Sequence, residues 1–523
     1  MAAKDSSRRP GELGFIEMLR WMWRQLTSMR TALILLLLLA LGAIPGSLIP
    51  QSEIDSLKAT NWKQAHPDLT TWFDRFGLFD IYSSPWFGAI YLLLMISLIG
   101  CILPRLAVYW RSLRSAPVAT PRNLLRLPDS ASYTTDLPPE EVLARAGRLL
   151  RRERVRVEAD SVSADRGRLR EAGNLVFHIS VVLVLVGFAA GMLFGYKGGV
   201  ILVQGNGFTN TLSQYDEIRP GSLFDPDSMD NFHLRVDDFE LSWLTDGPGA
   251  GMARKFEAHV SYENPTGSSA RGYNLRVNHP LSIGATDVFL IGHGYAPVIT
   301  VRDAGGNVVQ SGPVIFLPLD ESFRSTGVVK APAAEPEQIG LDGEFYPNVA
   351  YDPHTNSYYS SFGDAFAERA DPMISMLVYT GDLGLDDGAA QSVYSLDTTN
   401  ARMLMKDDGS APLRLDLRPG ESIDLPDGLG SVSLEGIERW QRLQISSTPG
   451  RTLALGGVIA ALIGLMGSLF IRPRRTWVRA QQGEGGTLVH VAALDRSGGG
   501  DTAEVVEQLV AALRARPSQE ENR

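Results

Sequence analysis

The sequence predicts a polytopic membrane protein with four transmembrane α-helices. A large, mainly-β extracytoplasmic domain is expected between helices 3 and 4, and a small α+β cytoplasmic unit between helices 2 and 3. Three observations predict this class. Four apolar runs are long enough to cross a bilayer, arginine residues gather in alternate segments between the runs, and one long segment combines strand-like patterns with frequent turns.

Composition excludes several classes of protein. The 523 residues include 49 Lys and Arg against 59 Asp and Glu, a net charge of −10, which argues against nucleic-acid binding because that requires a basic face. Cys101 is the only cysteine, so the chain cannot form an internal disulfide, a CxxC redox centre, an Fe–S cluster or a cysteine-based zinc site. The mean hydropathy of −0.03 resembles that of a soluble protein only because the apolar residues are unevenly distributed.

The four apolar runs contain no Asp, Glu, Lys or Arg, as expected where an unpaired charge is costly. We expect transmembrane helices over residues 31–50, 86–104, 174–195 and 451–471. A secretory signal peptide is the alternative for the first run, since basic residues precede it. Its apolar core exceeds the length of a signal-peptide h-region, and Pro45–Gln51 lacks an A-x-A cleavage pattern, so we expect a retained span.

The Lys and Arg residues orient these helices, because short basic loops remain in the cytoplasm. They are concentrated in residues 1–30, 105–173 and 472–523. Both termini and the loop between helices 2 and 3 are therefore expected in the cytoplasm, and residues 51–85 and 196–447 outside the plasma membrane. Binding of anionic lipid headgroups is a second explanation for the arginines of the cytoplasmic loop, but the topology already accounts for them.

The loop of residues 51–85 is rich in aromatic side chains, which usually sit in the headgroup belt beside a membrane span. A platform that stacks a cofactor is the alternative, and we prefer the belt. The aromatic residues of this loop are Trp62, Trp72, Phe73, Phe76, Phe79 and Tyr82.

Residues 105–173 are expected to form a small ordered unit. Ser132–Thr135 and Arg154–Glu158 have strand patterns, and Pro138–Glu141 begins a helix with acidic residues in its first turn. The Gly-rich C-terminal tail is expected to hold one helix, capped by Asp501. Its apolar face needs a partner, either the small unit or another subunit, and consists of Val505, Val506, Leu509, Val510 and Leu513.

Residues 196–447 have the signature of β structure. Alternating or β-branched runs such as Asn231–Phe239 and Lys255–Tyr262 are separated by turn signals such as Asn264–Gly267. The stretch Val328–Gly343, with several Ala, Pro and Glu, is interpreted as a long loop or hinge. We therefore expect a sandwich-like or open-barrel domain, in one or two lobes.

With cysteine excluded, histidine is the strongest candidate ligand. His178 is the only histidine within the four spans, and a polar ring in the hydrocarbon layer indicates a ligand or a proton relay. Imidazole is also the usual axial ligand of haem iron. A satisfied ring near the cytoplasmic interface is the alternative, because a rise of 1.5 Å per residue puts His178 only about 5 Å inside Leu175.

The outer segment holds five histidines, and none is paired with another at metal-ligand spacing, so a structural zinc site is not expected there. These are His233, His259, His279, His293 and His354. His279 and His293 are weak candidates for contact with a ligand, because small or rigid residues surround them. No G-x-S-x-G, P-loop, H-E-x-x-H or correctly placed Rossmann motif is present, so an autonomous hydrolase is not expected.

Several stretches of the sequence together resemble the ResB family of system II cytochrome c biogenesis proteins. The resemblance covers about residues 15–480 and is specific as a set, although no single motif would suffice. The stretches that carry it are Arg30–Leu33 with Ile44–Gln51, Ser84–Phe87 with Ser97–Arg105, Leu169–Asn174 leading into His178, Gly467–Phe470 with Arg472–Trp477, Asn278–Leu281 and Gly292–Pro297.

The resemblance implies a subunit of a cytochrome c haem lyase, or synthetase, complex. Such a complex delivers reduced haem across the membrane for covalent attachment to the CxxCH of apocytochrome c. The implied partners are a ResC (CcsA-type) membrane subunit, apocytochrome c and a thioredoxin-like thiol-reducing system, which fits the single cysteine. No Trp-rich haem motif is visible, so the joining chemistry is expected in the partner and this chain is not expected to be catalytic alone.

The resemblance also assigns the candidate site. His178 matches the third-span histidine of the family and is expected to be an axial haem ligand, with haem bound transiently and shared with the partner. Arg168 and Arg170 are weaker candidates, as partners of the haem propionates. His279 and His293 remain weak candidates for haem contact.

The outer domain is expected to dock partners. The segment 195–447 carries 17 basic and 35 acidic residues, so a basic or unfolded client is favoured, because complementary charge speeds encounter. The competing interpretation is a membrane-anchored receptor or scaffold whose β domain binds a ligand and which has no role in haem handling. Such a receptor should purify colourless.

Overall fold

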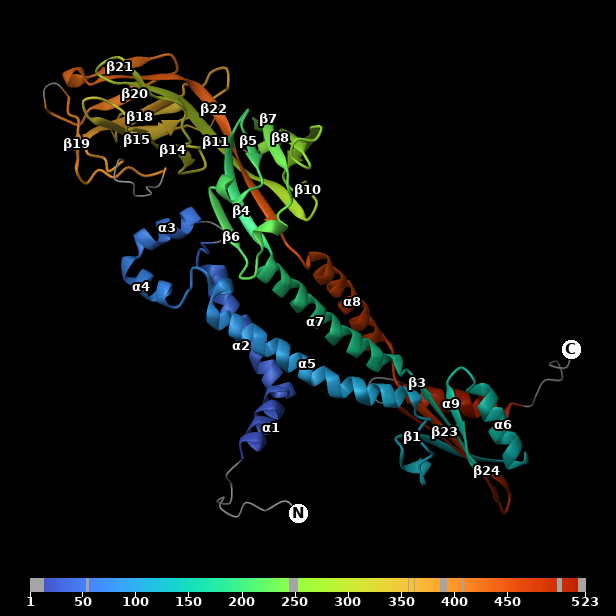
Figure 1. Ribbon diagram of the computed structural model, residues 1–523. Helices are drawn as coiled ribbons and strands as arrows, with labels where there is room; N and C mark the ends of the chain where they lie inside the picture. The colour runs from blue at the N-terminus through green and yellow to red at the C-terminus, as the bar shows by residue number, and fades with distance from the viewer. Residues whose placement is uncertain are drawn as a thin grey trace. The chain divides into compact units, whose positions relative to one another are not determined.

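The computed structural model of the protein describes residues 14–52, 56–243, 253–355, 357–361, 363–385, 393–406, 409–495 and 501–515. The chain divides into two compact units. One consists of Met1–Ala189 with Gly450–Arg523, and the other of Ala190–Pro449. The first unit contains the long helices and a small sheet, and the second consists mainly of β-strands (Figure 1).

Four long helices confirm the expected number of candidate membrane spans, since each is long and apolar enough to cross a bilayer. They are α2 (Met29–Leu48), α5 (Pro85–Arg114), α7 (Leu169–Phe194) and α8 (Arg451–Phe470). Two of them extend beyond the apolar runs: α5 continues through Pro104, and α7 begins six residues before Leu175. Polar turns therefore prolong both helices at the ends that the sequence predicts to be cytoplasmic.

A short helix, α1 (Phe15–Leu26), precedes α2, and the turn between them is bound to α5. Ser97 Oγ donates a hydrogen bond to the carbonyl of the last α1 residue at 2.5 Å, and Cys101 Sγ donates to the Thr27 carbonyl at 2.8 Å. Gly100 permits this approach, because a Cβ at that position would collide with the Thr27 side chain. The lone cysteine thus makes a structural contact between helices.

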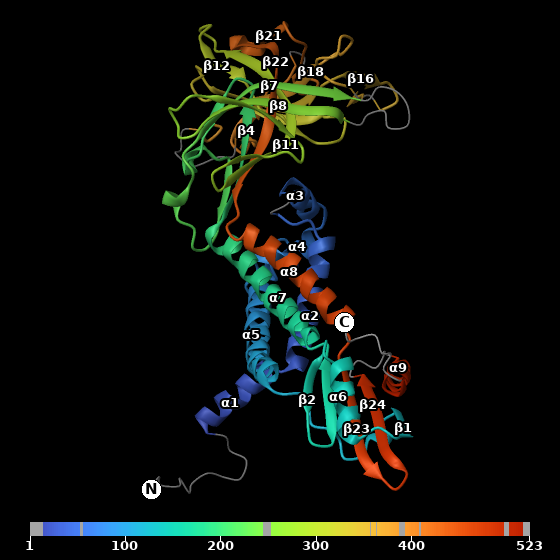
Figure 2. The same ribbon diagram turned by 90° about the vertical axis from the view of Figure 1, so that its right-hand side faces the viewer.

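The helices α7 and α8 lie side by side (Figures 1 and 2) and approach closely through glycine. A Cβ on Gly464 of α8 would lie 2.6 Å from the backbone nitrogen of Phe177. A Cβ on Gly173 of α7 would lie 2.6 Å from the backbone nitrogen of Ser468. Small residues that let two backbones meet are a common basis of helix association in membranes.

The aromatic segment between α2 and α5 contains α3 (Ser56–Ala65) and α4 (Pro67–Arg75). Trp62 packs against three rings at centroid distances of 4.4, 5.1 and 5.4 Å, those of His66, Phe73 and Phe79. Trp72 and Phe76 are instead 58% exposed. Part of the aromatic content therefore serves internal packing, and a headgroup belt remains a prediction for the exposed rings.

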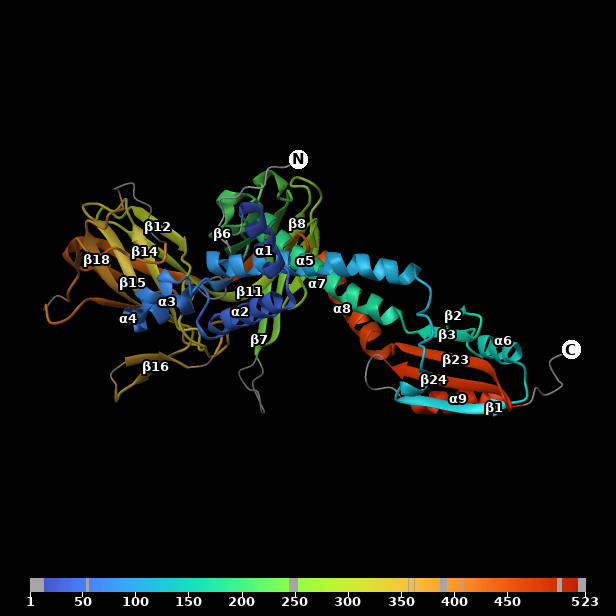
Figure 3. The same ribbon diagram turned by 90° about the horizontal axis from the view of Figure 1, so that it is seen from below.

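The small domain of the first unit is a five-stranded antiparallel sheet in the order β1-β24-β23-β3-β2, covered by two helices (Figure 3). Its strands are β1 (Asp129–Thr135), β2 (Arg154–Val157), β3 (Ser161–Arg166), β23 (Arg474–Gly483) and β24 (Gly486–Asp495). Its helices are α6 (Pro139–Leu149) and α9 (Thr502–Arg514). The sheet joins the segment between α5 and α7 to the segment after α8.

The C-terminal tail contains more structure than one helix. The expected helix is α9, and its partner is the small domain, since Val506, Leu509 and Leu513 share a buried core with Val142 and Ala146 of α6. The hairpin of β23 and β24 was not predicted. The three arginines and the Gly-rich turn in this stretch obscured an alternating pattern that buries Val478 and Ala480 of β23 in that core.

In the part of the second unit that the structure describes, there are four antiparallel sheets. The seven-stranded sheet has the order β10-β11-β22-β4-β6 with β12 on β11 and β21 on β22, and its strands are β4 (Tyr196–Val203), β6 (Glu217–Pro220), β10 (Leu281–Ile283), β11 (Thr286–Arg302), β12 (Val308–Pro313), β21 (Ser422–Leu425) and β22 (Gly430–Ser447). The six-stranded sheet consists of β13 (Leu317–Pro318), β14 (Ser325–Ala331), β15 (Gln338–Tyr346), β18 (Met373–Gly381), β19 (Ala401–Met403) and β20 (Arg414–Leu417). The smaller sheets consist of β5 (Gly207–Thr209), β7 (His233–Trp243), β8 (Ala253–Glu263) and β9 (Arg271–Arg276), and of β16 (Val349–Asp352) with β17 (Ser357–Ser360).

Two hydrophobic cores divide this unit into two lobes, and the paired strands β11 and β22 run through both. Ile299 and Val432 lie in the core formed with the six-stranded sheet. Val288 and Leu443 lie in the core formed with the four-stranded sheet. The two long strands therefore connect the lobes as one continuous ribbon.

The interpretation of Val328–Gly343 as a loop or hinge is wrong. Most of this stretch belongs to β14 and β15, which pair in one antiparallel hairpin. Val329, Ile339 and Leu341 are buried in the core, as expected of strands with an inward apolar face. The Ala, Pro and Glu residues that suggested a hinge belong to the connection between the two strands.

Candidate functional site

The candidate ligand His178 lies well inside α7. The helix begins at Leu169, so His178 stands about 14 Å along it, after roughly two and a half turns. Its side chain is half-buried, and the edge of the neighbouring Phe177 ring packs against it at a centroid distance of 5.3 Å. The ring is thus accessible without being solvated on all sides.

One nitrogen of His178 is already bound within the helix. Nδ1 lies 2.8 Å from the carbonyl oxygen of Asn174, one turn earlier. Because a carbonyl oxygen only accepts hydrogen bonds, Nδ1 carries the proton and Nε2 presents its lone pair. Metal-binding histidines commonly donate their second N–H to a backbone carbonyl, which fixes the tautomer and the ring orientation. The donor set therefore fits an axial ligand.

The side of α7 that carries His178 is directed toward α5 rather than α8. Glu171, His178 and Leu185 are spaced by seven residues, or about two turns, so they share one face. The hydroxyl of Tyr91 on α5 donates a hydrogen bond to the Leu185 carbonyl, and Tyr109 of α5 is close enough to Glu171 to interact with its charge. His178 lies between these two contacts, on the face opposite the glycine contacts with α8.

The two arginines just before His178 have different environments. Arg168 Nε lies 2.8 Å from Asp165, and its Nη1 donates to the carbonyls of Ser112 and Ser115 at 2.6 and 3.1 Å. It therefore ties the end of α5 to the start of α7. Arg170 is half-buried and has no ion pair with any residue that the structure describes.

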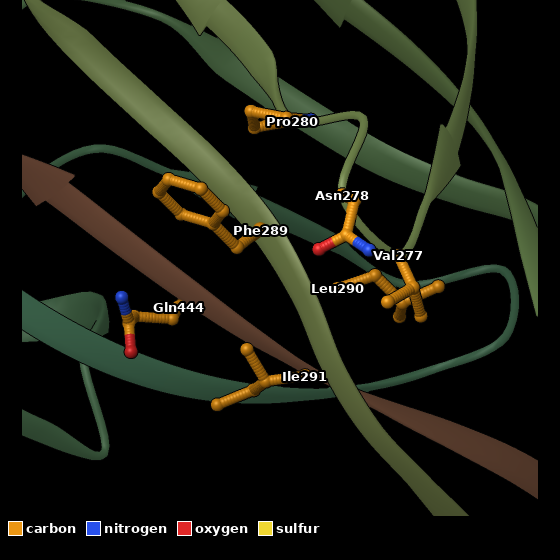
Figure 4. Close-up of a pocket in the computed structure, with 7 residues that line it drawn as sticks. All are labelled: Val277, Asn278, Pro280, Phe289, Leu290, Ile291 and Gln444. Atoms are coloured by element: carbon orange, nitrogen blue, oxygen red, sulfur yellow. The ribbon is translucent and has the colours of Figure 1, made fainter. Parts of the chain in front are cut away.

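His279 lies in the other unit, exposed in the turn between β9 and β10. Beside this turn is an open hollow of about 540 Å³ (Figure 4), lined by Val277, Asn278, Pro280, Phe289, Leu290, Ile291 and Gln444. Its lining is mainly apolar, and Asn278 and Gln444 supply the polar groups. The hollow has no titratable side chain among its lining residues, so it offers no acid–base chemistry.

His293 is buried in the β unit, with an exposed fraction of 6%. Its ring stacks on that of Phe323 at 4.4 Å and contacts Phe239 and Phe256 at 5.6 and 5.4 Å. Burial, assisted by the nearby Arg439 guanidinium, lowers the pKa of His293 to about 4. The ring is therefore neutral at physiological pH and is part of the packing between the two lobes.

A buried ion pair accompanies His293. Arg439 pairs with Asp364 at 2.5 Å, and Tyr295 donates a hydrogen bond to the same carboxylate at 2.9 Å. Burial and the Asp364 charge raise the pKa of the Tyr295 hydroxyl far above its usual value. These contacts pair the polar groups of Arg439, Tyr295 and Asp364 inside the unit.

The structure also brings together residues that the sequence did not single out. Asp238, Glu240 and His259 place their ligand atoms within 4.8 Å of one another on two paired strands. Spacing along one strand could not reveal this group, because its members meet only through the register of β7 with β8.

The protein has four helices that are long and apolar enough to cross a membrane, together with a mainly-β unit, and these features define a multi-pass membrane protein. One of the four helices carries the half-buried His178, whose Nε2 is available. The ResB-like family model matches residues 29–507, and the chain belongs to that family.

Comparison with characterised proteins gives relatives of modest identity, each named cytochrome c biogenesis protein CcsB. The chain is 29% identical to the protein from Gloeobacter violaceus over 272 residues, which are 49% of this chain and 52% of the relative. It is 28% identical to the protein from Synechococcus sp. strain WH7803 over 303 residues, 56% of this chain and 64% of the relative. For Synechococcus sp. strain CC9605 the figures are 26% over 351 residues, 62% and 72%. The match thus spans about half the length of the first relative.

Proposed function

We propose that this chain acts in cytochrome c biogenesis as the haem-handling partner of a system II synthetase complex. The observation that supports it most is the geometry of His178, whose Nδ1 is bound to the Asn174 carbonyl while Nε2 stays available. Membership of the ResB-like family and the names of the relatives supply the pathway. Haem is the cargo in this proposal.

His178 would bind haem iron through Nε2 as one axial ligand. The Asn174 carbonyl would hold the ring in place, which also increases the donor strength of the imidazole. A CcsA-type subunit would supply the second ligand and the bond-forming chemistry, since this chain is assigned only one axial ligand. Arg170 is better suited than Arg168 to meet a propionate, because the donors of Arg168 are engaged.

The arrangement of charge supports one orientation in the membrane. The small domain and both termini would lie in the cytoplasm, and the β unit would lie outside, where it could meet apocytochrome c and the thiol-reducing partners. The acidic character of this unit, with 17 basic and 35 acidic residues in 195–447, favours a basic client.

The haem proposal is tested by purifying the chain together with a co-expressed CcsA-type subunit and recording the absorbance spectrum. His178→Ala should reduce bound haem by about tenfold or more, because it removes an axial ligand. His354→Ala, which changes an exposed histidine of the β unit, should retain it. A His178→Ala complex with the wild-type haem content would overturn the assignment, and a colourless wild-type complex in a strain with normal c-type cytochromes would favour a receptor.

The orientation is tested by labelling single cysteines in a Cys101→Ser background with a membrane-impermeant maleimide. Thr355→Cys, in the β unit, should react in intact cells. Gln482→Cys, in the small domain, should react only after the membrane is opened. The reverse pattern would invert the topology.

A further inference from the structure

The solvent-facing side of the four-stranded sheet in the β unit carries a compact polar cluster. In the strand register, Asp238 of β7 lies opposite His259 of β8, and Glu240 lies opposite Glu257. The alternate side chains of both strands, such as Phe239 and Ala258, are buried in the hydrophobic core. The four polar side chains therefore project together from the opposite face.

The spacing of these groups fits one metal ion. The ligand atoms of Asp238, Glu240 and His259 all lie within 4.8 Å of one another, and His259 Nε2 is 2.9 Å from Glu240 Oε1. Two ligand atoms bound to the same tetrahedral zinc ion at about 2.1 Å are about 3.4 Å apart. The ligand atoms need little movement to surround an ion.

The neighbouring strand and loop hold two of the ligands in place. His259 Nδ1 lies 3.0 Å from Asn274 Oδ1 on β9, so the ring donates from Nδ1 and directs Nε2 to the cluster. Gln204 Nε2 donates to Asp238 at 3.0 Å. Such outer contacts orient the ligands of metal sites.

Glu257 adds a further negative charge on the same face, beside this group. It is only 9% exposed, although it stands on the polar face of the sheet. Its carboxylate forms no hydrogen bond or ion pair with any side chain in the described ranges, while its charge acts on both Lys255 and His259. A bound cation would offset the repulsion between this carboxylate and those of Asp238 and Glu240 on the same face.

We propose that Asp238, Glu240 and His259 form a binding site for a divalent transition-metal ion of the zinc type, with the charge of Glu257 beside them. One imidazole nitrogen together with carboxylate oxygens is a donor set typical of zinc, whereas Ca²⁺ and Mg²⁺ prefer oxygen alone. The ammonium group of Lys255 now binds Glu240, but its side chain is 46% exposed and can turn into solvent when an ion enters. This site is separate from the proposed haem ligand.

The test is a titration of the purified full-length chain, stripped with a chelator, with Zn²⁺ by calorimetry and with Co²⁺ by visible absorbance. Wild-type protein should bind one equivalent of each ion. His259→Ala and the isosteric Asp238→Asn should each weaken binding by about tenfold or more. His354→Ala, an exposed histidine elsewhere in the unit, is the matched control and should bind as wild type.

A second variant, Lys255→Met, should bind Zn²⁺ several-fold more tightly, because it removes a cation that competes for Glu240. Saturable binding that both His259→Ala and Asp238→Asn retain at wild-type strength would overturn the proposal. So would wild-type protein that takes up no ion, a result that does not depend on how any variant folds.

Discussion

The sequence makes both His178 and His293 candidate ligands, yet the two side chains occupy opposite environments. His178 is half-buried on a helix and keeps Nε2 available, because Nδ1 is bound to a backbone carbonyl. His293 is enclosed by aromatic rings between two lobes, where burial holds it neutral. The comparison shows that burial alone does not make a histidine a ligand. Access to one lone pair, with the other nitrogen fixed, distinguishes the two sites.

The largest expected difference between the two histidines is in bound haem, and it can be tested by replacing the His178 ring with added imidazole. His178→Gly should lose about tenfold or more of the bound haem in the co-purified complex, and added imidazole should restore it, because the ligand enters the vacated space. His293→Phe should keep the haem, since its role is packing. Absorbance with and without imidazole measures both effects. Loss without rescue, in a complex that still assembles, would contradict a ligand role for His178.

The next largest effect concerns pH and His293. In the unfolded chain this ring gains a proton as the pH falls through about 6.5, whereas in the folded chain it does so only near pH 4. The unfolding free energy should therefore fall between these values as the pH is lowered, by on the order of 3 kcal/mol. Denaturant unfolding of the full chain in detergent at several pH values measures this slope.

His293→Phe preserves an aromatic ring but removes the proton uptake, so its stability should depend less on pH over the same range. His354→Ala, which changes an exposed ring, should behave as wild type. Equal slopes in the wild type and His293→Phe would show that the buried ring is not the group responsible.

The smallest effect tests the contact beside His178. Tyr91→Phe removes the hydroxyl that donates to the Leu185 carbonyl and should cost about 1 kcal/mol of stability, as single interhelical hydrogen bonds do. Thermal unfolding in detergent measures the loss. Haem content should stay within about twofold of wild type, because α7 itself holds His178. A haem loss as large as that of His178→Ala would show that Tyr91 takes part in haem binding.

Features with a local cause could be predicted from the sequence. The spans follow from uncharged apolar runs, and the start of α6 follows from its proline and acidic residues. Even the Nδ1 contact of His178 is local, because Asn174 is one helical turn away. The hinge prediction failed because it assigned the character of the proline-rich turn between β14 and β15 to the whole stretch, including the two strands beside it.

Features that depend on distant residues could not be predicted. The burial of His293 requires Phe239, Phe256 and Phe323 from separate strands and loops. The cluster around His259 requires the register of β7 against β8, including an irregularity after Val236 that single-strand alternation does not reveal. Pairing of β3 with β23 joins segments about 300 residues apart, and no local pattern specifies such a partner.

That last pairing has a consequence for biosynthesis. β1 and β3 leave the ribosome long before β23 and β24, the two strands that lie between them in the finished sheet. At about 5–20 residues per second, the wait is on the order of 15 to 60 s. During this time unpaired strand edges stay open to misassociation, which invites protection by a chaperone. The domain can be completed only after α8, the last of the four candidate membrane-spanning helices, has been synthesised.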